Sequence, residues 1–89
     1  MTSQTTERFR AAFRDLPEHI QRRAREAYQL WNTDPWHASL QFKQVHPSRP
    51  IFSVRIGIGW RALGVRRGEA MIWFWIGSHS DYDKLLSQM

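Results

Sequence analysis

The chain has no cysteine, so disulfide bonds and thiolate metal sites are excluded and a reducing compartment is expected. No apolar run approaches the roughly 20 residues that cross a bilayer, since the longest, at residues 70–76, has the length of a strand. The arginine-containing N-terminus is not followed by the apolar segment of a signal peptide. These absences predict a cytoplasmic protein without a membrane partner.

Acidic residues are few and unevenly placed. Eight Asp and Glu stand against thirteen Lys and Arg, which gives a formal net charge of +5, and residues 35–68 contain no acid. The bases in that acid-free stretch are Lys43, Arg49, Arg55, Arg61, Arg66 and Arg67. This distribution favours a polyanionic partner, although a basic surface that serves solubility or binds an acidic protein gives the same pattern.

The length limits the architecture. A chain of 89 residues is shorter than a typical domain, so we expect a single domain over residues 1–89. A two-domain enzyme and a long solenoid are thereby excluded. Five tryptophans and five phenylalanines supply large apolar side chains, which let a small core reach useful stability without disulfides or metals.

Apolar spacing in the first third of the chain predicts two helices. Apolar residues recur at helical intervals between Phe9 and Leu16, and a second stripe follows at residues 17–31. Because almost nothing separates the two stretches, they should form an antiparallel hairpin. The polar residues before them either cap the first helix, through Thr5 or Thr6, or add a short edge strand.

Beyond a polar, proline-containing turn the apolar period changes to that of strands. Strands are predicted at about residues 40–46, 51–57, 60–65 and 70–76. Alternation in the last of these places Trp73 and Trp75 on one face, and a Ser80-x-x-Asp83 signature caps a short helix that ends near Ser87. The fold class is therefore α+β: an N-terminal helical hairpin packed on a small antiparallel sheet of three to four strands, with a short C-terminal helix.

The turn between the second and third of these strands decides where two arginines point. With a two-residue loop, Ile58-Gly59, Arg55 lies opposite Ala62 and Arg61 projects from the other face. With a three-residue or bulged loop, Arg55 lies directly opposite Arg61 on one face. Like charges that face each other across a sheet cost stability, so the second arrangement is typical of half an anion site.

Three blocks of the sequence resemble a known family. They read DP.H.SL.FK at residues 34–43, SVRIG.GWRALG at residues 53–64 and WFWIGSHSDYDKLL at residues 73–86. In this order, behind a helical hairpin, they resemble the RelE/ParE superfamily of toxins from type II toxin–antitoxin systems. The similarity extends from about Arg8 to Leu86.

The resemblance implies a small basic toxin that a cognate antitoxin holds inactive, in a hetero-oligomer that binds operator DNA through the antitoxin. RelE-like members are endoribonucleases (mRNA interferases) that cleave mRNA, usually on the ribosome, without a metal or cofactor, and so inhibit translation. ParE-like members share the fold but poison DNA gyrase and have no nuclease chemistry. The residues favour the RNA-binding nuclease branch and leave the gyrase poison as the alternative.

The resemblance also implies which residues act. RNA cleavage without a metal needs groups that transfer protons and cations that stabilise the phosphorane. Histidine exchanges protons near neutral pH, and arginine presents a planar fork to phosphate oxygens. The catalytic residues expected on this basis are His79, Arg61, Arg55 and Tyr82, and the RNA-binding residues are Lys43, Arg66 and Arg67.

Each of these residues also has a structural interpretation. Arg55 can pair with an aspartate of the last helix, Arg61 can lie over a neighbouring tryptophan, and Tyr82 can anchor the last helix by packing. His79 can bond a backbone carbonyl at the end of its strand. The arginines at residues 22–25 are expected to form a solvated helix face rather than an RNA clamp.

Overall fold

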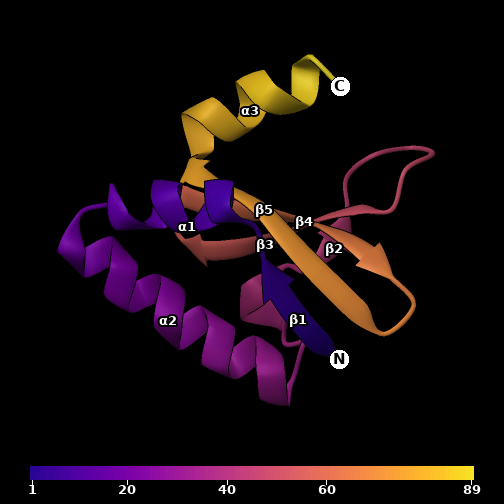
Figure 1. Cartoon of the computed structure of the whole chain (residues 1–89), viewed down its shortest axis with the longest axis horizontal. Helices are drawn as coiled ribbons and strands as arrows, with labels where there is room; N and C mark the ends of the chain where they lie inside the picture. Colours follow the sequence, from indigo (N-terminus) through magenta and orange to yellow (C-terminus); the bar gives the residue numbers. More distant parts are fainter.

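The computed structural model describes all 89 residues, and it contains an α+β fold with one five-stranded sheet (Figure 1). The elements are β1 (Thr2–Thr5), α1 (Glu7–Arg14), α2 (Glu18–Thr33), the 3₁₀ helix η1 (Ala38–Leu40), β2 (Lys43–Gln44), β3 (Ile51–Gly57), β4 (Trp60–Arg67), β5 (Ala70–Ser78) and α3 (His79–Ser87). The predicted fold class is confirmed. None of the helices combines the length and the apolar character that crossing a bilayer requires.

The sheet is larger than predicted and is mixed. Its strand order is β1-β5-β4-β3-β2, and every pair is antiparallel except β1 with β5. The polar N-terminal residues form this parallel edge strand, in which Thr2 lies beside Ala70 and Thr5 beside Trp73. The expected three to four antiparallel strands are thus corrected to five, because the short N-terminal segment completes the edge beside β5.

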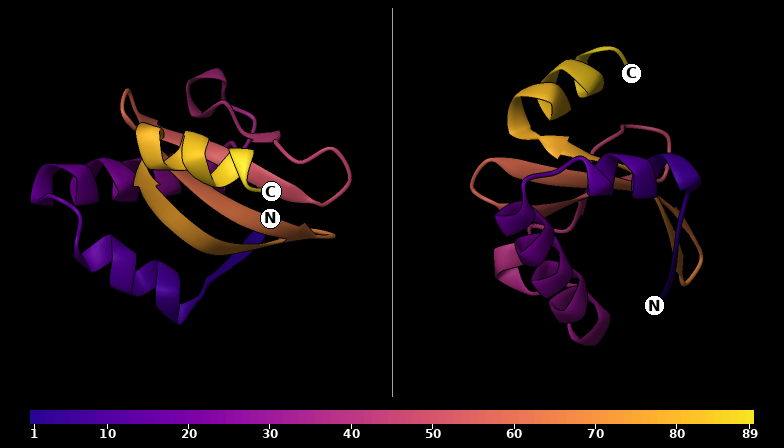
Figure 2. Two further views of the ribbon diagram at one scale, coloured as in Figure 1. Left: turned by 90° about the horizontal axis from the view of Figure 1, so that it is seen from above. Right: turned by 60° about the vertical axis from the view of Figure 1, so that its left-hand side comes forward.

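Both faces of the sheet are covered, by different helices (Figure 2). Helices α1 and α2 lie on one face, over the main core, and α3 crosses the other face over a smaller cluster; the side that α3 partly covers is called the α3 face. The main core consists of Ala24, Trp31, Leu40, Phe42, Phe52, Val54, Ala62, Met71, Trp73 and Ile76. The smaller cluster consists of Ile51, Leu63 and Tyr82.

Caps define where the helices begin. Thr6 caps α1, because its Oγ1 accepts a hydrogen bond of 3.1 Å from the Phe9 N–H. Pro17 precedes α2 directly, as proline is tolerated at a helix start. For α3 the predicted capping residue was wrong: Ser78, not Ser80, accepts the N–H of Asp81 at 3.2 Å.

Two predicted strands differ from the observed ones. The stretch at residues 40–46 forms η1 and a strand of only two residues, because Gln41 adopts a left-handed conformation (φ 46°) that breaks the extended chain. In β5, Leu63 pairs with Trp75 whereas Gly64 pairs with Trp73, so one extra residue is accommodated in the last strand. Trp73 therefore points into the main core and Trp75 toward the α3 face, which corrects the prediction that they share a face.

Candidate functional site

The hairpin of β3 and β4 brings two arginines together. Gly57 pairs with Trp60 around a two-residue loop, but a register shift follows and Arg55 pairs with Arg61. The bulge at Ile56 thus produces the facing arrangement that the bulged alternative predicted. Neither Arg55 nor Arg61 forms a salt bridge, so two positive charges lie side by side on the α3 face without an acidic partner.

Arg61 is held in place by the hairpin itself. Its Nη1 donates hydrogen bonds to the carbonyl oxygens of Gly57 at 3.0 Å and of Trp60 at 2.8 Å. Burial lowers the pKa of Arg61 and the charge of Arg55 lowers it further, while Tyr82 and Asp83 act in the opposite direction. Because Nε and Nη2 donate no bond within the protein, this preorganised guanidinium keeps donors for an anion.

His79 is the first residue of α3, and this helix begins at the end of the sheet where the β3–β4 loop lies (Figure 1). Its backbone N–H donates to the Gly59 carbonyl at 2.7 Å, which ties the helix start to the β3–β4 loop. On its side chain, Nδ1 lies 3.2 Å from Asp83 Oδ2, one helical turn away. A carboxylate at one ring nitrogen fixes the orientation of an imidazole and leaves the other nitrogen, Nε2, free for a substrate.

Tyr82 lies next to His79, with 5.6 Å between the ring centroids, but most of it is buried. Only 7% of its surface is exposed, and its hydroxyl donates a 3.2 Å hydrogen bond to Oγ of Ser53, which is itself buried on β3. The position favours the interpretation of Tyr82 as the anchor that fixes α3 to the sheet.

The structure divides the predicted RNA-binding residues. Lys43 lies opposite Ser53 on the exposed edge strand and so shares the α3 face with the arginine pair. Arg66 instead projects from the helical face, with its guanidinium over the Phe52 ring at 5.6 Å. Arg67 ends β4 at the opposite end of the sheet from Arg61, six residues or about 20 Å along an extended strand. Neither Arg66 nor Arg67 therefore joins the group around Arg61.

Two residues of this site were missed by sequence reasoning. Asp83 was interpreted as a capping acid, although its spacing of four from His79 on a predicted helix already allowed the contact. Ser53 was assigned no role, because its contact with Tyr82 joins residues 29 positions apart. No three His, Asp or Glu side chains lie close enough together to hold a metal ion.

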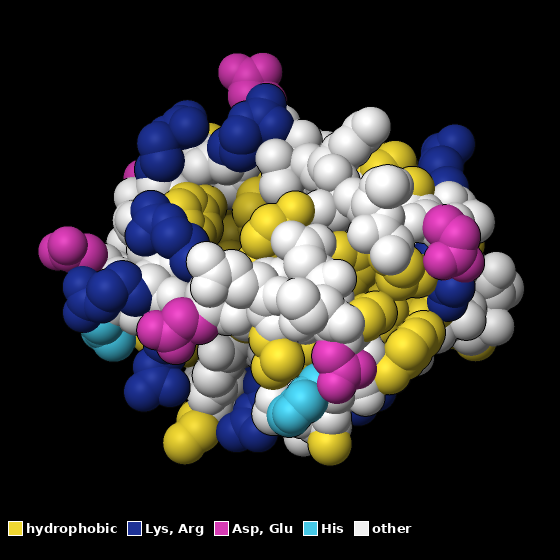
Figure 3. Space-filling model, turned by 90° about the horizontal axis from the view of Figure 1, so that it is seen from below, with side chains coloured by type: hydrophobic (Ala, Val, Ile, Leu, Met, Phe, Trp, Pro, Cys, Tyr) yellow, Lys and Arg dark blue, Asp and Glu magenta, His cyan; other side chains and the backbone are white.

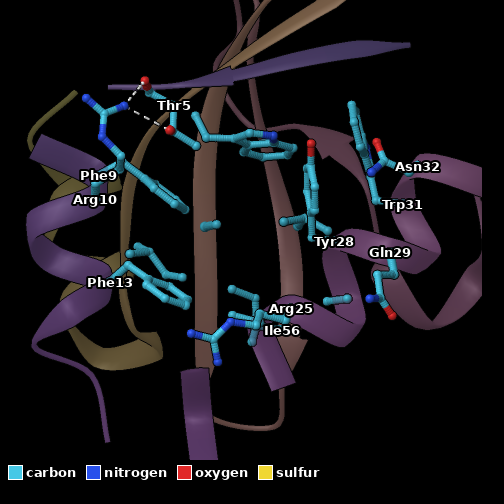
Figure 4. Close-up of a pocket in the computed structure, with 16 residues that line it drawn as sticks. Thr5, Phe9, Arg10, Phe13, Arg25, Tyr28, Gln29, Trp31, Asn32 and Ile56 are labelled. Atoms are coloured by element: carbon cyan, nitrogen blue, oxygen red, sulfur yellow. Dashed lines mark hydrogen bonds between the residues drawn. The ribbon is translucent and has the colours of Figure 1, made fainter. Parts of the chain in front are cut away.

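A separate apolar groove opens between α1 and α2. It has a volume of about 420 Å³, and Phe9 and Phe13 of α1 face Tyr28 and Trp31 of α2 across it (Figure 4). Figure 3 shows hydrophobic side chains at the floor of a hollow, with Lys and Arg side chains around it. Arg10 and Arg25 belong to the lining, so the groove is apolar inside and positively charged at its edge.

The fold is that of several solved toxins. A chain of the RelB–RelE antitoxin–toxin complex from Methanococcus jannaschii matches with a TM-score of 0.71 at 18% identity, over 90% of this chain and 95% of that chain. YafQ from E. coli strain BL21(DE3) matches with a TM-score of 0.72 at 8% identity, over 90% and 94% of the two chains. The isolated E. coli RelE toxin matches with a TM-score of 0.63 at 12% identity, over 98% and 96%. At such identities the likeness shows the fold alone.

Sequence comparison supplies the family. No curated protein sequence matches the chain. The family model of the ParE-like toxin domain, however, matches residues 18–84, which run from the start of α2 into α3 and include the arginine pair and His79. The chain therefore belongs to the ParE-like toxin domains, and it is a toxin of the RelE/ParE superfamily of toxin–antitoxin systems.

Proposed function

We propose that this toxin is an endoribonuclease, in which Arg55, Arg61 and His79 act on one phosphodiester of mRNA. The observation that carries the proposal is the unneutralised arginine pair beside an imidazole held by a carboxylate. The 2.7 Å bond from the His79 N–H to the Gly59 carbonyl keeps the imidazole at the same end of the hairpin as both guanidinium groups. Cations with an adjacent proton donor are what RNA cleavage requires.

Each group has a defined task in this reaction. The guanidinium groups of Arg55 and Arg61 bind the non-bridging oxygens and stabilise the charge of the phosphorane. The 2′-oxygen attacks phosphorus and its proton passes to water, since the group contains no second imidazole. His79 donates a proton through Nε2 to the leaving 5′-oxygen, so the P–O5′ bond breaks to give a 2′,3′-cyclic phosphate and a 5′-hydroxyl end.

Mapping of RNA 5′ ends in cells that express the toxin tests this assignment. The wild-type protein should produce new 5′ ends and arrest growth, whereas His79→Ala should lower the cleavage rate by about 10²–10⁴-fold, as loss of a general acid does. His19→Ala is the matched control, because His19 is exposed on α2 and its side chain forms no hydrogen bond or ion pair. It should cleave like the wild type.

Two results would overturn the nuclease assignment. Undiminished cleavage and toxicity in both His79→Ala and Arg61→Ala would remove these residues from the reaction. Growth arrest with intact RNA and a DNA-damage response would instead indicate the gyrase poison, the alternative activity in this superfamily. Because both variants change exposed or half-exposed side chains, thermal unfolding confirms that they remain folded.

We infer that a cognate antitoxin binds the groove between α1 and α2 with an acidic, amphipathic segment. The apolar lining accepts one face of such a segment, and Arg10 and Arg25 complement acidic side chains at its edge. In the RelB–RelE complex from Methanococcus jannaschii, the toxin is bound to an antitoxin. A hetero-oligomer of this kind would hold the toxin inactive and reach operator DNA through the antitoxin.

A further inference from the structure

A second concave site lies at the tip of the β3–β4 hairpin, where the hairpin meets α2 and η1. This cleft has a volume of about 310 Å³, and half of its ten lining residues are apolar, whereas eleven of the sixteen that line the apolar groove are. Its lining residues are Arg23, Glu26, Ala27, Leu30, Ser39, Leu40, Arg55, Ile56, Gly57 and Ile58. Through Arg55 it is continuous with the arginine pair on the α3 face.

Two arginines from different elements, Arg23 of α2 and Arg55 of β3, are among the lining residues of the cleft. A Cβ atom at Gly57 would lie 3.6 Å from Arg23 Cδ and 3.7 Å from Arg23 Nη1, so the exposed Arg23 side chain lies against the hairpin at Gly57. Neither Arg23 nor Arg55 forms a hydrogen bond or an ion pair through its side chain, and Glu26, although it lines the cleft, pairs with neither. Two arginines without an acidic partner at one cleft supply hydrogen-bond donors for an anion.

The rest of the cleft is apolar, with one feature that points outward. Leu30 and Ile56 are among its apolar lining residues, and Ile58 at the loop tip is 85% exposed, which is unusual for a large hydrophobic side chain. An apolar surface beside two cations matches a nucleotide, which presents the flat face of a base next to a charged phosphate. The volume is also that of a small-ligand site.

We propose that this cleft binds the nucleotide adjacent to the scissile phosphodiester, with Arg23 and Arg55 holding its phosphate and Ile58 contacting its base. The proposal rests on the proposed nuclease function, because Arg55 serves both the cleft and the catalytic pair. The RNA would then pass from the α3 face around the hairpin tip, and Arg23 would act in binding rather than in chemistry. The arginines at residues 22–25 are all exposed, as the expectation of a solvated face has it, and the proposal gives one of them, Arg23, a role in RNA binding.

The salt dependence of RNA binding tests this. The probe is a short, fluorescein-labelled single-stranded RNA whose 2′-hydroxyls are all methylated, so that it binds but cannot be cleaved. Its dissociation constant is measured by fluorescence anisotropy between about 50 and 200 mM KCl. Arg23→Ala should weaken binding and lower the slope of log K against log salt by about 0.7, the value for one phosphate contact to a single strand.

Arg22→Ala is the matched control. It removes the same charge from the neighbouring, equally exposed position of α2, but Arg22 pairs with Glu18 at 3.8 Å and does not line the cleft. Its slope should equal that of the wild type. Equal slopes for both variants would overturn the proposal, as would a result in which Arg23→Ala weakens binding of a polyglutamate peptide but leaves the RNA slope unchanged.

Cleavage of unmodified RNA by the wild type separates this proposal from the nuclease assignment. If RNA is cleaved but the Arg23→Ala slope is unchanged, the cleft proposal alone fails. If the slope falls as expected while unmodified RNA stays intact, the cleft binds RNA and the nuclease assignment fails. Arg23→Val removes the same charge but leaves a different side chain. If the slope change comes from the lost charge, Arg23→Val and Arg23→Ala should have the same slope.

Discussion

The hydrogen bond between Tyr82 and Ser53 predicts a non-additive pair of mutations. Both side chains are buried, with 7% and 2% of their surfaces exposed, and the bond is 3.2 Å long. In Tyr82→Phe the Ser53 hydroxyl stays buried without its partner, which costs about 1–3 kcal/mol. In a domain of this size each kcal/mol lowers the unfolding midpoint by about 4–8 °C.

Removing both hydroxyls should restore part of that stability. In the double variant Tyr82→Phe/Ser53→Ala no polar group is left unsatisfied, so the free energy of unfolding should exceed the additive expectation by about 1–2 kcal/mol. Urea unfolding of the four proteins measures this coupling, with tryptophan fluorescence as the signal, since the Trp75 ring lies 6.5 Å from that of Tyr82. Additivity within about 0.5 kcal/mol would refute the reasoning.

The same variants separate stability from activity. Tyr82 ties α3 to β3, and His79 begins that helix, so loss of the bond loosens the imidazole as well as the fold. RNA cleavage should fall in Tyr82→Phe and stay low in the double variant, although its stability recovers. Activity that recovers together with stability would show that the bond supports folding only.

Four further predictions concern other parts of the molecule. Arg55→Gln should raise the unfolding midpoint by a few degrees, because it removes a like charge opposite Arg61 that costs about 0.2–1 kcal/mol. The same variant should reduce RNA cleavage, since Arg55 belongs to the proposed site. A lower midpoint would contradict the prediction. Folding lowers the pKa of Arg61, so the charged form of Arg61 opposes folding at every pH below that pKa, and an anion bound to it should stabilise the fold. Sulfate should therefore raise the unfolding midpoint of the wild type more than chloride does at equal ionic strength. An equal effect of sulfate on Arg61→Gln would show that the sulfate binds elsewhere. Gly64→Ala should cost about 1–3 kcal/mol in urea unfolding, because its Cβ would lie 2.6 Å from Met71 Cε, whereas Gly59→Ala, with nothing within 4 Å, should be neutral. Tyr28 lines the apolar groove, so Tyr28→Glu should weaken antitoxin binding, measured by calorimetry, by about tenfold or more. The rate of RNA cleavage should not change. An unchanged affinity for the antitoxin would exclude the groove as the antitoxin site.

The local signals of the sequence predicted most of the elements. Helical spacing and the threonine cap located α1 and α2, and alternation located β3 and β4, because these patterns depend on residues that are close in the chain. The edge strand β1 was left as one of two alternatives, since four polar residues become a strand only when β5 supplies hydrogen-bond partners. The paired residues of β1 and β5 are about 68 positions apart in the chain, so a local sequence pattern cannot predict this strand.

The candidate site shows the same division. The sequence alone determined an acid-free basic segment, two arginines on one hairpin and a histidine at the end of the last strand. Only the tertiary structure decided that Arg55 faces Arg61 and that Trp75 lies on the other face from Trp73. The physical reason is the two-residue period of a strand: one extra residue in a bulge moves every following side chain to the other face. Where that residue is accommodated depends on packing across the sheet rather than on the local sequence.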